Sequence, residues 1–251
     1  MVHLFGQPAL GTEEILEIAK RRSLFVIEDA AQAFGAEIKI NGQWRPVGGL
    51  GDIGCLSFAP SKPFAAPGNG GAIIFSPTSA SCYGEIDRMR FYGAKRHYYD
   101  YPTIGINCKM HEVQAAALLA RLPFFDHWLG HRQRLAEYYN AHLDNLEDLT
   151  LPQRYENAKA IWYRYIVRTK RRDELFEHIQ KNANGITALL PEKFYPVLLP
   201  SFSAFRRETT PADDFPIASR CAQETLALPM SNFLSIKDIA AVVKSIREFY
   251  V

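Results

Sequence analysis

The chain has 251 residues, of which 47% are hydrophobic and 22% are charged. This length allows one large domain or two smaller ones, and a chain of this composition can bury a core and need not be disordered. The 29 basic and 27 acidic side chains leave a formal net charge of +2, so charge gives no argument for binding nucleic acid or an anionic membrane.

The cysteines and the N-terminus bear on the cell compartment. Four cysteines lie far apart with no Cys-x-x-Cys, which argues against a disulfide framework and a zinc ribbon and fits a reducing cytosol. The N-terminal MVHLFGQPALGTEE lacks a basic run followed by an apolar stretch, so we expect no secretory leader. No apolar run reaches the roughly 18 residues of a membrane-spanning helix. We therefore expect a soluble, cytoplasmic, mixed α/β protein.

The first predicted elements are a helix and a strand. Residues 12–22 have the pattern of a helix, with Thr12 as its cap, acidic residues at its start and basic residues at its end. The run LFVIED (24–29) predicts a strand that is buried on both faces. A helix followed at once by such a strand indicates crossover connections and a parallel sheet. Asp29 would then stand at the carboxyl end of a strand, where open α/β sheets bind ligands.

A loop rich in proline and glycine is predicted to lie between two buried strands. Residues 41–54 are rich in turn-forming residues, and two short apolar runs follow at 55–58 and 72–75. The loop APSKPFAAPGNGG (59–71) connects these runs. Loops held by rigid strands often carry functional residues, so this loop is a candidate site.

The middle of the chain is predicted to be helical. Residues 112–122 form an Ala/Leu-rich helical pattern, Pro123 interrupts it, and a second amphipathic helix is expected over 124–143. The chain turns polar over 149–157, which predicts a domain boundary. Beyond it we expect an α+β unit with a strand (161–169), a helix (172–182), a long ordered loop with five prolines (191–216) and a closing helix capped by Ser235 (233–250).

Three motifs fail the tests of the sites they resemble. Gly49–Gly54 matches G-x-G-x-x-G, but a strand-like run follows it instead of a helix, so we expect a tight turn rather than a dinucleotide site. His111-Glu112 begins H-E-x-x-H, yet Ala115 stands where the second histidine belongs. His127 and His131 lie four residues apart without a third ligand. We expect no metal site.

Lys62 is the residue of the proline- and glycine-rich loop that carries chemistry. Taken alone, it would be predicted to be a solvated surface lysine. Ser57 precedes it in a predicted strand, and Asp29 ends an earlier strand. A lysine amine that forms a Schiff base, with an acid that keeps a pyridinium protonated, is the chemistry of pyridoxal phosphate (PLP). A hydroxyl near the lysine could join the hydrogen bonds of the cofactor phosphate.

Several blocks of sequence carry a family resemblance. They are VHLFGQPA (2–9), VIEDAAQAFGA (26–36), GDIGCLSFAPSKPF (51–64), GNGGAIIF (68–75), IGINCKMHEVQAA (104–116) and FPIASRCAQETLALPMS (215–231). In this order they resemble the DegT/DnrJ/StrS-type sugar aminotransferases, which share the aspartate-aminotransferase fold (fold type I). The resemblance implies an α/β protein. Residues 1–148 would be the remainder of a PLP-binding large domain with a partial mixed or parallel sheet, and residues 149–251 a C-terminal α+β small domain.

The resemblance also implies roles for individual residues. Lys62 would bond to PLP and then act as the base and acid of the proton shift, and Asp29 would pair with the pyridinium nitrogen. Gln32 would lie beside the cofactor ring, and Ser57 would bind the phosphate. Asn107 would reach the phosphate of a partner subunit's cofactor, which implies a homodimer with shared sites.

Members of the family move an amino group, commonly from glutamate, to a keto group of a nucleotide-linked sugar for surface polysaccharides or antibiotic sugars. This chain departs from them in three places. It lacks the segment that members carry ahead of VHLFGQPA, it has Cys108 and Lys109 where an aromatic residue and an arginine are common, and its 195–202 stretch has no histidine. The alternative hypothesis is therefore a shortened, non-catalytic protein that dimerises or binds a partner. A sugar dehydratase of the same fold would have histidine at position 62, so Lys62 argues against that activity.

Overall fold

The computed structural model describes residues 1–95, 99–183, 186–205 and 215–251. The chain forms two compact units, the first made of residues 1–129 and 155–163 and the second of residues 130–154 and 164–251. These two units do not meet between residues 148 and 149, where the sequence predicts the domain boundary. That boundary stays a prediction.

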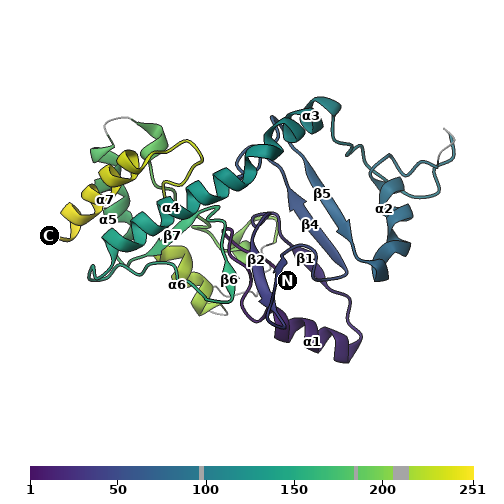
Figure 1. The fold of residues 1–251 in the computed structure, drawn as a ribbon, viewed down its shortest axis with the longest axis horizontal. Helices are drawn as coiled ribbons and strands as arrows, with labels where there is room; N and C mark the ends of the chain where they lie inside the picture. The colour runs from purple at the N-terminus through teal and green to yellow at the C-terminus, as the bar shows by residue number, and fades with distance from the viewer. Residues whose placement is uncertain (96–98, 184–185, 206–214) are drawn as a thin grey trace. The chain divides into compact units, whose positions relative to one another are not determined.

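The first unit contains a mixed sheet of three strands, in the order β1 (Ile27–Asp29), β4 (Ile53–Ser57) and β5 (Gly71–Phe75) (Figure 1). β1 and β4 are parallel, and Asp29 is paired with Cys55. β5 runs antiparallel to β4, so that Ser57 at the end of β4 is paired with Gly71 at the start of β5. Asp29 and Ser57 therefore both lie at the carboxyl edge of the parallel pair.

The predicted strand over 24–29 is only partly correct. The strand covers 27–29, and it has one buried face rather than two, because Leu24, Phe25 and Ile27 are each more than half exposed. The side chain on the buried face is that of Glu28, a charged residue. An apolar run does not distinguish a strand covered on both faces from one whose apolar side chains lie on an open face.

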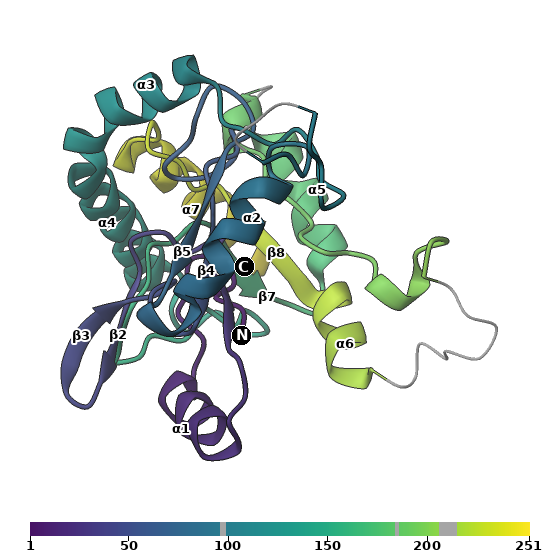
Figure 2. The same cartoon turned by 90° about the vertical axis from the view of Figure 1, so that its right-hand side faces the viewer.

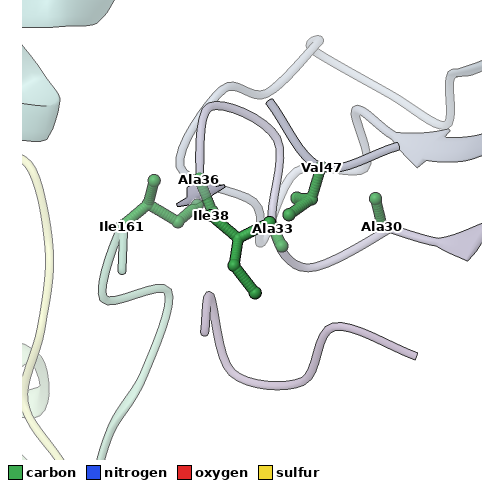
Figure 3. Packing of buried hydrophobic residues seen from close by; sticks show 6 residues of the cluster. All are labelled: Ala30, Ala33, Ala36, Ile38, Val47 and Ile161. Carbon is green, nitrogen blue, oxygen red and sulfur yellow. The ribbon is translucent and has the colours of Figure 1, made fainter. Parts of the chain in front are cut away.

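A second small sheet was not predicted, and one of its strands lies within the turn-rich segment over 41–54. Its strand order is β3 (Gln43–Pro46), β2 (Glu37–Ile40) and β6 (Ala158–Lys159), all antiparallel neighbours. Asn41 and Gly42 have φ angles of 50° and 76°, the left-handed pair that a two-residue hairpin turn requires. Alanines of the 30–36 turn pack with Ile38, Val47 and Ile161 into one core cluster (Figure 3). This core holds the turn after β1 in place.

The predicted helices of the first unit are found close to their expected bounds, whereas η1 and α2, over residues 77–89, were not predicted. α1 spans Thr12–Arg22 as predicted, but its N-cap is Gly11, since the Thr12 hydroxyl donates to the Ala9 carbonyl at 2.6 Å. Pro123 lies in a 3-10 turn between two helices, which confirms the predicted interruption. The remaining helical elements are η1 (Pro77–Cys82), α2 (Tyr83–Met89), α3 (Glu112–Arg121), η2 (Leu122–Phe124) and α4 (Phe125–Leu143), which continues into the second unit.

The second unit is built on the antiparallel pair β7 (Tyr165–Arg168) and β8 (Thr225–Leu228) (Figure 2). α5 (Arg172–Asn182) packs against α7 (Ile236–Tyr250) and β8. The predicted helices over 172–182 and 233–250 are confirmed, and Ser235 caps the latter by accepting the Asp238 N–H. The predicted strand over 161–169 is wrong at its start, since Trp162 has a φ of 51° that ends extended backbone. The unit also contains η3 (Thr187–Leu189), η4 (Leu199–Ser201) and α6 (Pro216–Glu224).

The predicted long loop over 191–216 contains η4, a turn at 203–205 and the first residue of α6, and residues 206–214 of it lie outside the described residues. Within the described ranges, no helix is both long and apolar enough to cross a membrane.

Candidate active site

Asp29, Cys55 and Ser57 share one face of the mixed sheet. Asp29 and Cys55 are paired in register, and Ser57 lies two residues beyond Cys55 on β4. Paired residues of neighbouring strands, and alternate residues of one strand, project to the same side of a sheet. Burial raises the pKa of the Cys55 thiol, and the nearby Asp29 carboxylate raises it further, which agrees with their proximity. A carboxylate and a hydroxyl thus stand together at the carboxyl edge.

The turn after β1 carries Asp29 and Gln32. The Asp29 side chain is exposed, and its Oδ1 atom accepts the Ala31 N–H at 3.1 Å. The Phe5 N–H donates to Gln32 Oε1 at 2.8 Å, and the Ala30 N–H donates to the Cys55 carbonyl at 2.9 Å. These bonds tie the turn to the N-terminal segment and to β4, so both predicted cofactor-binding side chains project from a fixed backbone.

Lys62 lies in the loop between β4 and β5, whose two ends are joined by backbone hydrogen bonds. Phe58 donates to the Gly70 carbonyl and accepts from the Ala66 N–H, each at 2.8 Å. The Lys62 Nζ atom lies 4.6 Å from the centroid of the Tyr163 ring, a cation–π distance. The Tyr163 hydroxyl lies 3.4 Å from Ser61 Oγ, so Tyr163 contacts both Lys62 and its neighbour. Tyr163 is a residue that the sequence analysis missed.

An aromatic cluster joins the Lys62 loop to the Asp29 turn. Phe34 of the turn lies with its ring centroid 5.6 Å from Phe58 and 5.5 Å from Phe64, and these two residues flank Lys62 in sequence. Phe125 of α4 stacks on Phe34 at 5.0 Å and lies 4.9 Å from Phe64. The structure therefore brings the segments of Lys62, Asp29, Gln32 and Ser57 together within the first unit.

Asn107 lies at a different place in the first unit. Its side chain is exposed, and its backbone forms an antiparallel bridge with Phe91. It lines a cavity of about 570 Å³ together with Gly71, which is the residue paired with Ser57. Lys109 also lines this cavity, with its Nζ atom 4.1 Å from the Phe91 ring. Among the described residues, no hydrogen bond or ion pair joins Asn107 to Lys62 or Asp29.

The rejected motifs have structural roles. Gly49–Gly54 forms a turn that leads into β4, as predicted, and N–H groups of this segment donate to the Glu28 carboxylate. His131 Nε2 bonds the Leu234 carbonyl at 2.8 Å. In the part of the chain that the structure describes, no group of three His, Cys, Asp or Glu side chains could hold a metal ion.

Comparison with known proteins identifies the family. The model of the DegT/DnrJ/EryC1/StrS aminotransferase family matches residues 1–247, so the chain belongs to this family. A dTDP-3-amino-3,4,6-trideoxy-alpha-D-glucose transaminase of Streptomyces venezuelae is 34% identical over 248 residues, which are 99% of this chain and 62% of the relative. A pleiotropic regulatory protein of Geobacillus stearothermophilus is 36% identical over 251 residues, 99% of this chain and 64% of the relative.

Solved structures agree with this assignment and with the predicted fold class. S. venezuelae DesV in complex with a ketimine intermediate superposes with a TM-score of 0.87 at 33% identity, covering 99% of this chain and 64% of the other. An aminotransferase of the same family from Brucella abortus gives a TM-score of 0.86 at 30% identity, covering 99% and 63%. The fold of the PLP-dependent sugar aminotransferases is thereby confirmed. The chain spans less than two thirds of the length of these relatives.

Proposed function

We propose that the protein holds PLP and transfers an amino group, with glutamate as donor, to a keto group of a nucleotide-linked sugar. One observation carries the proposal: Asp29 and Ser57 share a sheet face at the carboxyl edge, and the aromatic cluster joins the Lys62 loop to the Asp29 turn. An amine, a carboxylate and a hydroxyl are the groups that the aldehyde, the ring nitrogen and the phosphate of PLP need.

The residues present fit this cofactor. The Asp29 carboxylate is exposed, and its Oδ2 atom has no hydrogen bond among the described residues, so it has an acceptor for a protonated ring nitrogen. Ser57 Oγ accepts the Ala59 N–H at 3.3 Å and keeps its own proton to donate to a phosphate. Lys62 is half-buried and forms no ion pair with the described residues that would hold its amine elsewhere.

Each of these residues has one task in the proposed reaction. When bound, PLP supplies a pyridinium ring that withdraws electrons from the substrate carbon as its C–H bond breaks. Asp29 would hold the proton on the ring nitrogen, Ser57 would anchor the phosphate, and Gln32 would contact the ring. Lys62 Nζ would take the proton from the substrate carbon as a base and deliver it as an acid to the former aldehyde carbon of the cofactor, so that the amino group stays on the cofactor. Asn107 of each subunit would bind the phosphate in its partner's site, in a cytoplasmic homodimer.

The names of relatives support the class of acceptor substrate. Besides the dTDP-sugar transaminase, they include a UDP-N-acetyl-3-dehydro-alpha-D-glucosamine 3-aminotransferase of Acidithiobacillus ferrooxidans at 33% identity and a GDP-perosamine synthase of Escherichia coli O157:H7 at 31% identity. Three different nucleotides occur among them, so the shared chemistry is an amino sugar carried by a nucleoside diphosphate. We place the product in polysaccharide or amino-sugar biosynthesis.

Two half-reactions test the proposal. The chain is loaded with PLP and mixed with glutamate, and the absorbance reports conversion of the cofactor to its aminated form. Keto sugars linked to dTDP, UDP and GDP are then added, and the return of the PLP spectrum identifies the acceptor. Lys62→Ala is expected to abolish both conversions, whereas the matched control Lys20→Ala, on the exposed side of α1, leaves them unchanged. PLP that binds but never accepts an amino group would contradict the proposal and favour a partner-binding protein.

A further inference from the structure

A wholly buried pair of polar side chains lies directly behind the Asp29 turn. Glu28 precedes Asp29 on β1, and its side chain projects to the opposite, buried face of the strand. His3 is buried to the same degree, and its Nε2 atom lies 3.0 Å from Glu28 Oε2. Neither residue has a task in the proposed reaction.

The hydrogen bonds of His3 determine which of its nitrogens carries the proton. The Ala9 N–H donates to Nδ1 at 2.9 Å. A nitrogen that accepts a hydrogen bond has no proton, so the proton of the neutral ring is on Nε2, from which His3 donates to Glu28. His3 therefore presents one acceptor to the N-terminal segment and one donor to the carboxylate.

The Glu28 carboxylate has its acceptor positions filled. Oε2 accepts from His3 and from the Gly48 N–H at 2.7 Å, and Oε1 accepts from the N–H groups of Leu50 and of Gly51, the latter at 2.7 Å. Burial alone would raise the pKa of Glu28, but these hydrogen bonds outweigh it and lower the pKa, so the side chain is an anion at neutral pH.

These bonds fasten the backbone on both sides of the Asp29 turn. The His3 N–H donates to the Asp29 carbonyl at 2.9 Å, and the Asp29 N–H donates to the Met1 carbonyl at 2.8 Å. On the other side, Gly48 packs so closely on Ala30 that a Cβ atom at position 48 would lie 3.2 Å from the Ala30 Cβ. The Glu28 carboxylate thus links the N-terminal segment, the turn and the 48–51 loop.

We infer that Glu28, held by His3, is the positioning residue that fixes the Asp29 carboxylate and the Gln32 amide for the cofactor ring. The inference rests on the proposed function. A buried ion and imidazole stabilise a core less well than an apolar pair of equal volume. The pair instead fixes an orientation, because four hydrogen bonds hold the Glu28 carboxylate in one position. Small displacements of a group that binds a ligand lower the affinity or the rate strongly.

Two variants of His3 separate positioning from simple packing. His3→Gln places an NH₂ donor where Nε2 stood, so it can still donate to Glu28. His3→Asn places its carbonyl oxygen where Nδ1 stood, so it keeps the bond from Ala9 and loses the donor to Glu28. Glu28→Gln removes the anion itself. The control is Asp52→Asn, the same change of carboxylate to amide at the opposite end of β1, where Asp52 accepts the Val26 N–H at 2.8 Å.

Two readouts report the positions of Asp29 and Gln32. Amide hydrogen exchange of the chain without cofactor is followed at Ala31 and Phe5, because these N–H groups donate to Asp29 and Gln32. The dissociation constant for PLP is measured by absorbance. We expect His3→Asn and Glu28→Gln to speed exchange at both amides by about tenfold or more, and to weaken PLP binding by about tenfold or more. His3→Gln and Asp52→Asn should stay near the unmodified chain.

The outcomes decide between the claims. Equal effects of His3→Asn and His3→Gln, or unchanged exchange at Ala31 and Phe5 in His3→Asn, would overturn the inference. If Glu28→Gln fails to fold, the two His3 variants still decide it. If the unmodified chain binds no PLP, the proposed function fails for this chain, while the exchange measurements continue to test the positioning role.

Discussion

The substitution Glu28→Gln keeps the shape of the buried side chain and replaces one carboxylate oxygen by an NH₂ group. In either amide orientation the NH₂ faces two donors, namely the N–H groups of Leu50 and Gly51, or those of His3 and Gly48. Each buried donor left without an acceptor costs about 1–3 kcal/mol, so two of them lower the free energy of unfolding by about 2–6 kcal/mol at neutral pH.

The pH dependence of this loss has a definite sign. The pKa of Glu28 is lowered in the folded protein from its ordinary value of 4.5. The stabilisation from the ionised carboxylate is therefore fully present above about pH 4.5 and is lost as the pH falls through the lower pKa of the folded state. Glutamine does not titrate, so the stability difference between the two proteins shrinks in the same range.

Urea unfolding followed by tryptophan fluorescence measures the loss of unfolding free energy at neutral pH and its dependence on pH. Other titrating groups occur in both proteins and cancel in the difference. Asp52→Asn, at the residue that precedes β4, serves as the control. A loss at neutral pH below about 0.5 kcal/mol, the size of an ordinary surface substitution, would refute the account of the Glu28 bonds. A difference that stays constant from neutral pH to well below 4.5 would refute the ionised state.

Three further predictions concern other parts of the chain. Phe125→Ala removes a buried ring from the aromatic cluster and should lower the free energy of unfolding by about 3–5 kcal/mol in urea titrations. Ser235→Ala removes the cap that accepts the Asp238 N–H and should cost about 1 kcal/mol, measured by thermal unfolding at neutral pH. Asn107→Ala should weaken PLP binding in a dimer and leave it unchanged in a monomer, as judged by absorbance titration alongside sedimentation.

Each of these predictions has an outcome that contradicts it. A Phe125→Ala protein as stable as the original would mean that the cluster does not hold the Lys62 loop. An unchanged melting temperature in Ser235→Ala would mean that this cap does not stabilise α7. Equal loss of PLP affinity by Asn107→Ala in a demonstrated monomer would exclude a role for Asn107 in a partner's site.

Five of the helices were predictable because their signals are local, whereas α2 and α6 were not predicted. The helices over 12–22 and 172–182 match α1 and α5 residue for residue, and Ser235 caps α7 as expected. The hairpin of β2 and β3 was missed although Asn41-Gly42 is a strong hairpin signal, because the density of glycine and proline around it favoured turns alone. β8 was missed because its four residues follow a helix without any break.

The candidate site was predictable in part. Position within the motifs indicated Lys62, Asp29, Gln32 and Ser57, and the fold places their segments together. The residues that hold these four side chains in place contact them from segments that are remote in sequence. No local sequence pattern predicts such contacts. Tyr163, the last residue in sequence of the first unit, contacts Lys62. The Glu28 carboxylate bonds His3, next to the parallel bridge between Val2 and Asp29. Glu28 in particular lies within an apolar run, where the pattern predicts no charged group in the core.

The binding of PLP to Lys62 is tested by titrating the 251-residue chain with PLP, reducing it with borohydride and mapping the labelled peptide. We expect the absorbance band of lysine-bound PLP and a single labelled peptide that contains Lys62, with no label in Lys62→Ala. The absence of the band, or label spread over several surface lysines, would contradict the claim that the Asp29 turn and the Lys62 loop form a PLP site.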